Sequence, residues 1–204
     1  MELGVYIHYP WCRSRCPYCD FAVAIAPLDE IPHEAYLRAI LDELAVRGRE
    51  LAGRRLVSIY LGGGTPSLWW PDCVARAIAA VCDAFGGEPA SLEITIEANP
   101  ADCTAERLAA WRAAGIDRVS IGVQSLAPAD LVALGRDHRM GEGLSAIDAV
   151  AAAGFARYSA DLILGAPRRG GGARPGEGDP LAGAARLADR GVPHLSIYEL
   201  TVEE

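Results

Sequence analysis

The stretch Cys12-Arg-Ser-Arg-Cys16-Pro-Tyr-Cys19 places three thiols within eight residues. Thiolates at this spacing on a tight loop can bind three irons of a cubane iron–sulfur cluster and leave the fourth iron open to a small molecule. Pro17 prevents a continuous helix, so the loop can wrap around such a cluster. The alternative is a structural zinc site with His8 as fourth ligand. Zinc sites of that kind usually pair two cysteine knuckles, and this sequence has only one cysteine cluster.

Outside this loop, short apolar segments alternate with helical patterns along the chain. The predicted strands are Leu3–His8, Leu56–Leu61, Leu92–Glu97, Arg118–Val123, Tyr158–Leu164 and His194–Leu200. The predicted helices are Glu34–Leu51, Pro71–Phe85, Thr104–Ala114, Gly143–Ala153 and Leu181–Arg190. Strands that alternate with helices imply βαβ units and a parallel sheet.

Polar and glycine residues gather at or just after the ends of these predicted strands. They are His8, Gly62–Thr65, Glu97–Asn99, Gln124–Ser125 and Tyr198–Glu199. Parallel barrels assemble their active sites from several loops at this edge, whereas a doubly wound sheet concentrates its chemistry at one switch point. We therefore expect an α/β fold, a partial (βα)6 barrel of the TIM type with outer helices, formed as one domain by residues 1–204.

Several of these residues have side chains or backbones suited to holding a ligand. Three consecutive glycines in Gly62–Ser67 let the backbone approach a ligand closely and present its N–H groups. Glu97 can hold an amine or a ribose hydroxyl, or it can cap the following turn. Gln124 supplies an amide, and Arg136 can clamp a carboxylate with two hydrogen bonds. Asp161 is either a ligand contact or a buried structural acid.

Composition excludes several classes of protein. The 204 residues carry a net charge of −8, which disfavours nucleic-acid binding. No apolar stretch is long enough to span a membrane, and the N-terminus lacks a signal-peptide pattern, so we expect a cytoplasmic protein. The chain contains no lysine, which excludes lysine Schiff-base chemistry within it. Cys73, Cys82 and Cys103 fall on or beside helical segments, and we expect them to be core or incidental residues.

Together and in this order, the motifs resemble the radical S-adenosylmethionine (radical SAM) superfamily, specifically its coproporphyrinogen III oxidase-like branch. The resemblance covers nearly the whole chain. The matching segments are Tyr6–His8, Cys12–Cys19, Gly62–Ser67, Glu97–Pro100, Gly122–Ser125, Leu134–Arg136, Asp161–Pro167 and His194–Glu203.

The resemblance implies a 4Fe–4S cluster on Cys12, Cys16 and Cys19, with S-adenosylmethionine chelating the open iron. An electron donor such as flavodoxin or ferredoxin would reduce the cluster, and one electron would cleave the sulfonium to a 5′-deoxyadenosyl radical. The same resemblance implies which residues contact S-adenosylmethionine. Tyr6 and Tyr18 would lie beside the cluster, and Gly63, Gly64 and Thr65 would meet the amino group. Glu97 would hold the ribose or amine end, and Gln124, Arg136 and Asp161 would line the far side.

Within the branch, the chain resembles the HemW-type haem chaperones more than the oxygen-independent coproporphyrinogen III oxidases. Phe21 stands where the oxidases have a further cysteine. The family's C-terminal domain, with its haem motif, would lie beyond Glu204, and the Gly/Arg-rich loop Arg168–Asp179 replaces a more regular stretch. The implied ligand is haem or a porphyrinogen, and the implied partner is a haem-acceptor protein. A zinc-binding structural domain, or a barrel enzyme with incidental cysteines, is the alternative of another class.

Overall fold

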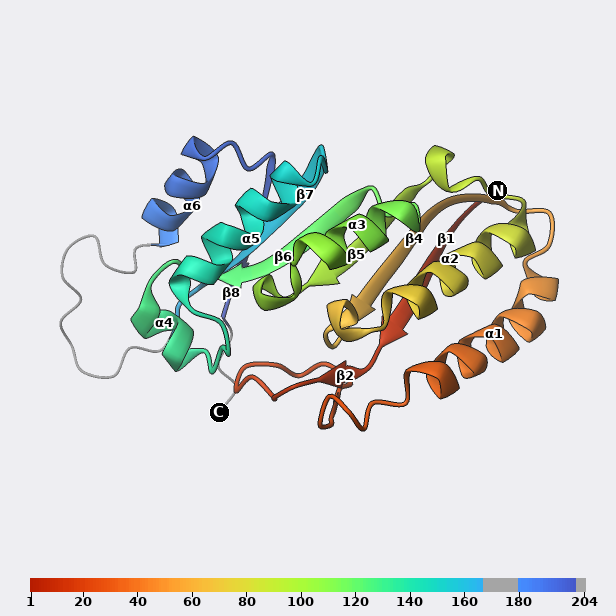
Figure 1. The fold of residues 1–204 in the computed structure, drawn as a ribbon, viewed down its shortest axis with the longest axis horizontal. Helices are drawn as coiled ribbons and strands as arrows, with labels where there is room; N and C mark the ends of the chain where they lie inside the picture. The colour runs from red at the N-terminus through yellow and green to blue at the C-terminus, as the bar shows by residue number, and fades with distance from the viewer. Residues whose placement is uncertain (167–179, 201–204) are drawn as a thin grey trace.

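The computed structural model describes residues 1–166 and 180–200, and its centre is a six-stranded parallel sheet (Figure 1). Its strands are β1 (Glu2–Tyr9), β4 (Arg55–Gly63), β5 (Glu93–Ala98), β6 (Arg118–Gln124), β7 (Arg157–Leu164) and β8 (His194–Glu199). The strand order β1-β4-β5-β6-β7-β8 follows the sequence, and every neighbouring pair is parallel. Because the order never reverses, the described sheet has no switch point, and its two edges stay open. This is the partial barrel that the sequence predicts.

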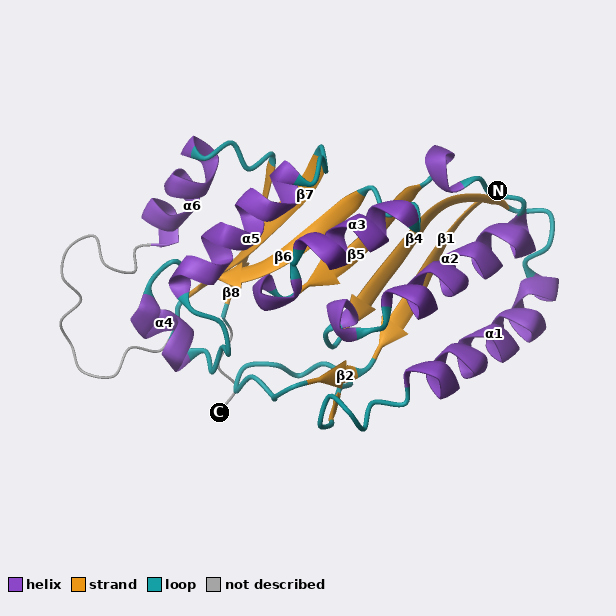
Figure 2. Ribbon diagram, in the orientation of Figure 1, coloured by secondary structure: helices purple, strands orange, loops and turns teal. Residues whose placement is uncertain are grey.

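Helices connect the strands and pack along one side of the sheet, where α2, α3 and α5 lie across it in a row (Figure 2). The described helices are α1 (His33–Glu50), α2 (Pro71–Phe85), α3 (Ala105–Ala113), α4 (Pro128–Ala133), α5 (Met140–Ala152) and α6 (Pro180–Asp189). Within residues 1–166 and 180–200, none of the helices has the length and apolar character needed to cross a membrane.

The two faces of the sheet differ in chemistry because side chains alternate along each strand. In β6, Val119, Ile121 and Val123 are fully buried in the hydrophobic core. Ser120 between them belongs to the other face, where it lies beside Glu97 in the strand register. The apolar face therefore holds the helices, and the polar face is left for a ligand.

The element predictions are confirmed, with shifts of one to three residues at most ends. Thr104 caps α3, since its hydroxyl accepts a hydrogen bond from the Arg107 N–H at 3.3 Å, and Gly115 follows the helix with a positive φ of 92°. The sequence did not predict α4 or the small parallel pair β2 (Trp11–Cys12) and β3 (Ala24–Ile25). The predicted loop 168–179 lies outside the described residues.

Candidate cofactor site

The three clustered cysteines lie on a loop that leaves β1 at the carboxyl edge of the sheet. The ends of this loop are joined by the β2–β3 pair, and the Ala24 N–H donates to the Pro10 carbonyl at 2.8 Å. A tight turn brings the Cys19 N–H to 3.0 Å from the Cys16 carbonyl. All three thiols are free and half-buried, whereas the other three cysteines of the chain are buried. The sequence-based separation of the two groups is confirmed.

Two of the loop thiols accept hydrogen bonds from the residues around them. The Thr65 hydroxyl donates to Cys12 Sγ at 3.3 Å, and Arg136 Nη1 donates to Cys16 Sγ at 3.7 Å. Burial raises the pKa of the Cys12 thiol, while the hydrogen bond from Thr65 opposes that shift. A hydroxyl donor and a guanidinium favour thiolates, the form that ligates iron. Within residues 1–166 and 180–200, no group of three or more His, Cys, Asp or Glu side chains is gathered closely enough to hold a single metal ion. The three free sulfurs on one loop instead suit a cluster, in which each cysteine binds a different iron.

A cavity of about 980 Å³ opens beside this loop, between it and the carboxyl ends of the strands. Its volume lies within the usual range for a cofactor site. Eleven of the twelve site residues predicted from the sequence line it, from the cluster loop, β4 to β7 and the segment after α4. These are Cys12, Cys16, Cys19, Tyr18, Gly63, Gly64, Thr65, Glu97, Gln124, Arg136 and Asp161.

Two carboxylates stand on the wall of the cavity. Glu97 accepts hydrogen bonds from the Tyr60 hydroxyl at 2.8 Å and from the Gly63 N–H at 3.1 Å. Asp161 accepts a hydrogen bond from Ser120 at 3.0 Å. Burial raises the pKa of both acids, and their hydrogen bonds oppose the shift. Two acids on one wall suit a ligand that offers hydroxyl groups or positive charge.

Tyr6 is the one predicted residue outside the cavity wall. Its hydroxyl pairs with His8 Nδ1 at 3.1 Å, and its ring stacks on Tyr60 with centroids 6.0 Å apart. Tyr6 therefore reaches the site indirectly, because Tyr60 donates to Glu97. The second ring nitrogen of His8 pairs with the Ala22 carbonyl at 2.9 Å. Both nitrogens of His8 are thus engaged within the protein, which is not the arrangement of a zinc ligand.

The glycine run corrects one expectation. Its N–H groups do not face a ligand, because the Gly63 N–H donates to Glu97, the Gly64 N–H to the Tyr9 carbonyl at 2.7 Å, and the Thr65 N–H to the Trp11 carbonyl at 2.9 Å. Two physical reasons account for this. The N–H groups of Gly64 and Thr65 continue the pairing of β4 with β1 past Gly63, and the Glu97 carboxylate takes the Gly63 N–H. The glycines allow this close approach. A Cβ on Gly64 would lie 2.8 Å from the Trp11 carbonyl and 3.0 Å from Cys12 Sγ.

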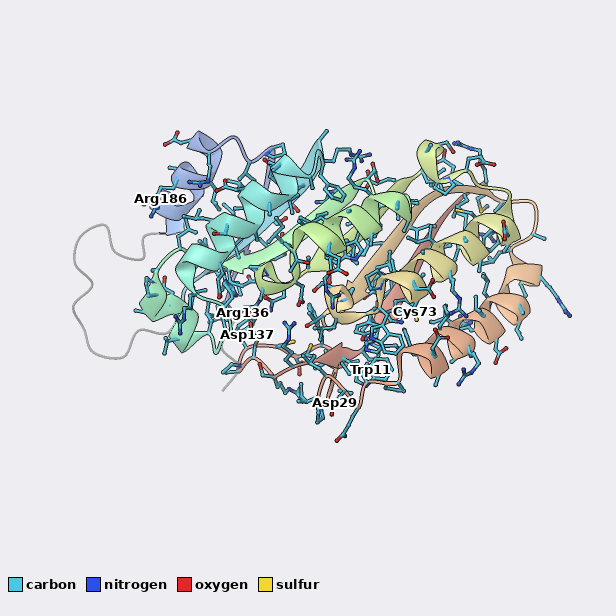
Figure 3. The ribbon with its side chains drawn as sticks, in the orientation of Figure 1. Trp11, Asp29, Cys73, Arg136, Asp137 and Arg186 are labelled. Atoms are coloured by element: carbon cyan, nitrogen blue, oxygen red, sulfur yellow. The ribbon has the colours of Figure 1, made fainter. Side chains whose placement is uncertain are left out.

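Sequence reasoning missed a set of charged and polar residues around Arg13. Arg13 lies inside the cysteine loop and pairs with the buried Asp102. Figure 3 places Arg136 and its neighbour Asp137 beside the same loop. No local pattern marks this set, because its members come from distant parts of the chain.

A cysteine loop over the carboxyl edge of a partial parallel barrel defines the class of protein, and the comparisons agree with it. The sequence profile of the radical SAM superfamily matches residues 6–169, and the chain belongs to that superfamily. The family implies a 4Fe–4S cluster and S-adenosylmethionine as cofactors.

Individual relatives show which members of the superfamily the chain resembles. The chain is 37% identical to the heme chaperone HemW of Haemophilus influenzae, over 98% of this chain and 51% of that protein. It is 38% identical to the bovine (Bos taurus) radical S-adenosyl methionine domain-containing protein 1, mitochondrial, over 98% of this chain and 43% of that protein. Among solved structures, the coproporphyrinogen III oxidase HemN of Escherichia coli superposes with a TM-score of 0.83 at 25% identity, covering 98% of this chain and 44% of that one. The chain therefore spans about half the length of the curated relatives it matches.

Proposed function

We propose that this chain is the cofactor-binding part of a haem chaperone similar to HemW. In this proposal Cys12, Cys16 and Cys19 hold the 4Fe–4S cluster, and the adjoining cavity binds S-adenosylmethionine. The observation that carries the proposal is the position of the three thiols, which are free, half-buried and on the wall of a cavity of about 980 Å³. Cysteine thiolates are the usual ligands of such clusters.

The wall of the cavity has partners for each part of S-adenosylmethionine. Arg136, which also reaches Cys16, suits the methionyl carboxylate next to the cluster. The amino group would meet carbonyl oxygens of Gly63 and Gly64 and the Thr65 hydroxyl, because the N–H groups of this run are already used. Glu97 and Asp161 suit the ribose hydroxyls.

The remaining predicted contacts are Tyr18 and Gln124 in the wall and Tyr6 behind it. When bound, the reduced cluster supplies the electron that cleaves the sulfonium. The protein's part is to orient the cofactor and to exclude water.

Two observations support the chaperone assignment: the 37% sequence identity to HemW of Haemophilus influenzae and the residue at position 21. Phe21 lines the cavity and is 66% exposed at a position where the oxidases carry a further cysteine. Haem as the bound ligand, a haem-acceptor protein, and an electron donor such as flavodoxin or ferredoxin complete the proposal. A cytoplasmic location stays a prediction. The second candidate is oxygen-independent coproporphyrinogen III oxidase, because the fold superposes closely on HemN.

Anaerobic reconstitution with iron and sulfide tests the cluster assignment. The protein is expected to gain broad absorption at about 400 nm. Replacement of Cys12, Cys16 or Cys19 by Ala is expected to abolish the band. Cys82→Ala is the matched control, because Cys82 is buried on α2 and its loss should leave the band intact. Stoichiometric zinc binding without iron uptake would contradict the proposal.

A second assay separates the chaperone from the oxidase. The reconstituted protein is incubated anaerobically with a strong reductant, S-adenosylmethionine and coproporphyrinogen III, and 5′-deoxyadenosine and porphyrins are measured together. We expect slow cleavage of S-adenosylmethionine without decarboxylation. Vinyl-bearing porphyrin formed in step with 5′-deoxyadenosine would favour the oxidase instead.

A further inference from the structure

Arg13 lies between the first two cysteines of the loop, and its guanidinium reaches the 3-10 turn Pro100–Asp102 that follows β5. Nη2 pairs with Asp102 Oδ1, and Nη1 lies 3.4 Å from Asp102 Oδ2. The Asp102 side chain is only 2% exposed. A carboxylate that is buried this deeply needs a cation beside it, because removal of one partner leaves an uncompensated charge.

Asp102 is itself fixed by the body of the fold. The hydroxyl of the fully buried Ser67 donates to Asp102 Oδ2 at 2.7 Å and accepts a hydrogen bond from the Asn99 N–H at 3.1 Å. Ser67 belongs to the turn Pro66–Leu68, directly after the glycine run. Asp102 is therefore a rigid anchor, and Arg13 is the group that attaches the loop to it.

The same guanidinium faces a second acid. Arg13 Nη1 lies 3.8 Å from Asp137 Oδ2, and Asp137 Oδ1 accepts a hydrogen bond from Asn99 Nδ2 at 3.0 Å. Asp137 directly follows Arg136, and Asn99 comes two residues after Glu97. One side chain of the cysteine loop thus joins the two segments that carry Arg136 and Glu97.

We propose that Arg13 is a positioning residue that couples the geometry of the cysteine loop to that of the S-adenosylmethionine contacts. This inference rests on the proposed function, since it takes Glu97 and Arg136 as cofactor contacts. Arg15 does not share the role: it is exposed, and the described part of the chain holds no ion pair of Arg15. Both arginines carry the same charge within the same loop. A comparison of the two variants therefore separates the effect of losing the contact with Asp102 from the effect of losing a positive charge.

The first test uses the protein without its cluster. Alkylation rates of Cys12 and Cys16 are measured by mass spectrometry after timed labelling in wild type, Arg13→Met and the control Arg15→Met. Loss of a charge-assisted hydrogen bond is expected to loosen the loop and to speed labelling roughly tenfold in Arg13→Met. Arg15→Met should label like wild type. Arg13→Lys should recover part of the protection, because a lysine restores the charge without the two-pronged contact.

The second test separates positioning from mere stability by means of the double variant Arg13→Met/Asp102→Asn. This variant removes the buried charge as well as its partner, so resistance to urea should recover relative to Arg13→Met. The dissociation constant for S-adenosylmethionine on the reconstituted protein should stay raised, roughly tenfold, because the anchor is still missing. Cluster content, measured as bound iron, should match wild type.

Two results would overturn the inference. One is wild-type labelling in Arg13→Met; the other is recovery of S-adenosylmethionine affinity together with stability in the double variant. Failure of wild type to take up iron would count against the proposed function instead. The labelling experiment would still decide whether Arg13 anchors the loop, because it needs no cluster.

Discussion

Replacement of Gly63 by Ala is expected to damage the fold before it damages cofactor binding. Gly63 has a φ of 114°, a conformation that side chains rarely adopt. A Cβ there would lie 2.7 Å from His8 Nδ1 and 2.9 Å from the Tyr9 carbonyl oxygen. The Tyr9 oxygen is backbone and already accepts the Gly64 N–H, so it cannot move away without loss of that bond.

The magnitude follows from two contributions. A strained backbone conformation costs about 1–3 kcal/mol. Forcing an extra methyl group into a packed position costs about 1–3 kcal/mol more. The expected loss of unfolding free energy for Gly63→Ala is therefore about 2–6 kcal/mol.

Gly53→Ala is the matched control, because Gly53 also has a positive φ, of 78°, but no atom lies within 4 Å of its Cβ position. This control carries only the conformational cost, about 1–2 kcal/mol. The gain from a stiffer unfolded chain is the same in both variants and cancels.

The assay is urea unfolding of the protein without its cluster, followed by circular dichroism. A loss in Gly63→Ala no larger than that in Gly53→Ala would refute the reasoning. Unchanged stability together with weaker S-adenosylmethionine binding would restore the view that the glycine leaves space for a ligand.

Three further predictions concern stability, each measured by urea unfolding. Thr104→Ala removes the cap of α3 and should lower the free energy of unfolding by about 1 kcal/mol. An unchanged free energy would show that the cap does not stabilise the helix. Trp111→Phe should cost less than the 3–5 kcal/mol typical of Trp→Ala, because the buried Trp111 N–H has no hydrogen-bond partner in the described structure; a loss equal to that of Trp111→Ala would contradict this. Burial raises the pKa of Asp161, so wild type should lose stability relative to Asp161→Asn as the pH rises from the ordinary aspartate range through the raised pKa. Parallel pH profiles of the two proteins would rule that out.

The positions of the site residues were predictable because of one geometric rule. Carboxyl ends of consecutive parallel strands meet at the same edge, so Glu97 and Gln124 had to come together once the strands were identified. Asp161 lies within β7, and only the family resemblance indicated it as a cofactor contact. The spacing of the cysteines predicted the position of the cluster ligands, because three thiols within eight residues share one loop.

Other features could not be predicted, for reasons that differ. The helix Pro128–Ala133 has only six residues, too few for a periodic pattern to show. The direction of the N–H groups in the glycine run depends on the register between β1 and β4, which composition does not specify. The pairing of Arg13 with Asp102 joins residues 89 positions apart, and periodicity carries no information at that distance.

That separation also sets an order of events during synthesis. The cysteines leave the ribosome long before Asp102 does, and at about 5–20 residues per second the delay is roughly 4–18 s. Throughout that interval the nascent loop lacks its contact with Asp102. Cys12 and Cys16 should therefore be alkylated faster in a ribosome-held chain that ends before residue 102 than in one extended past that turn and clear of the exit tunnel.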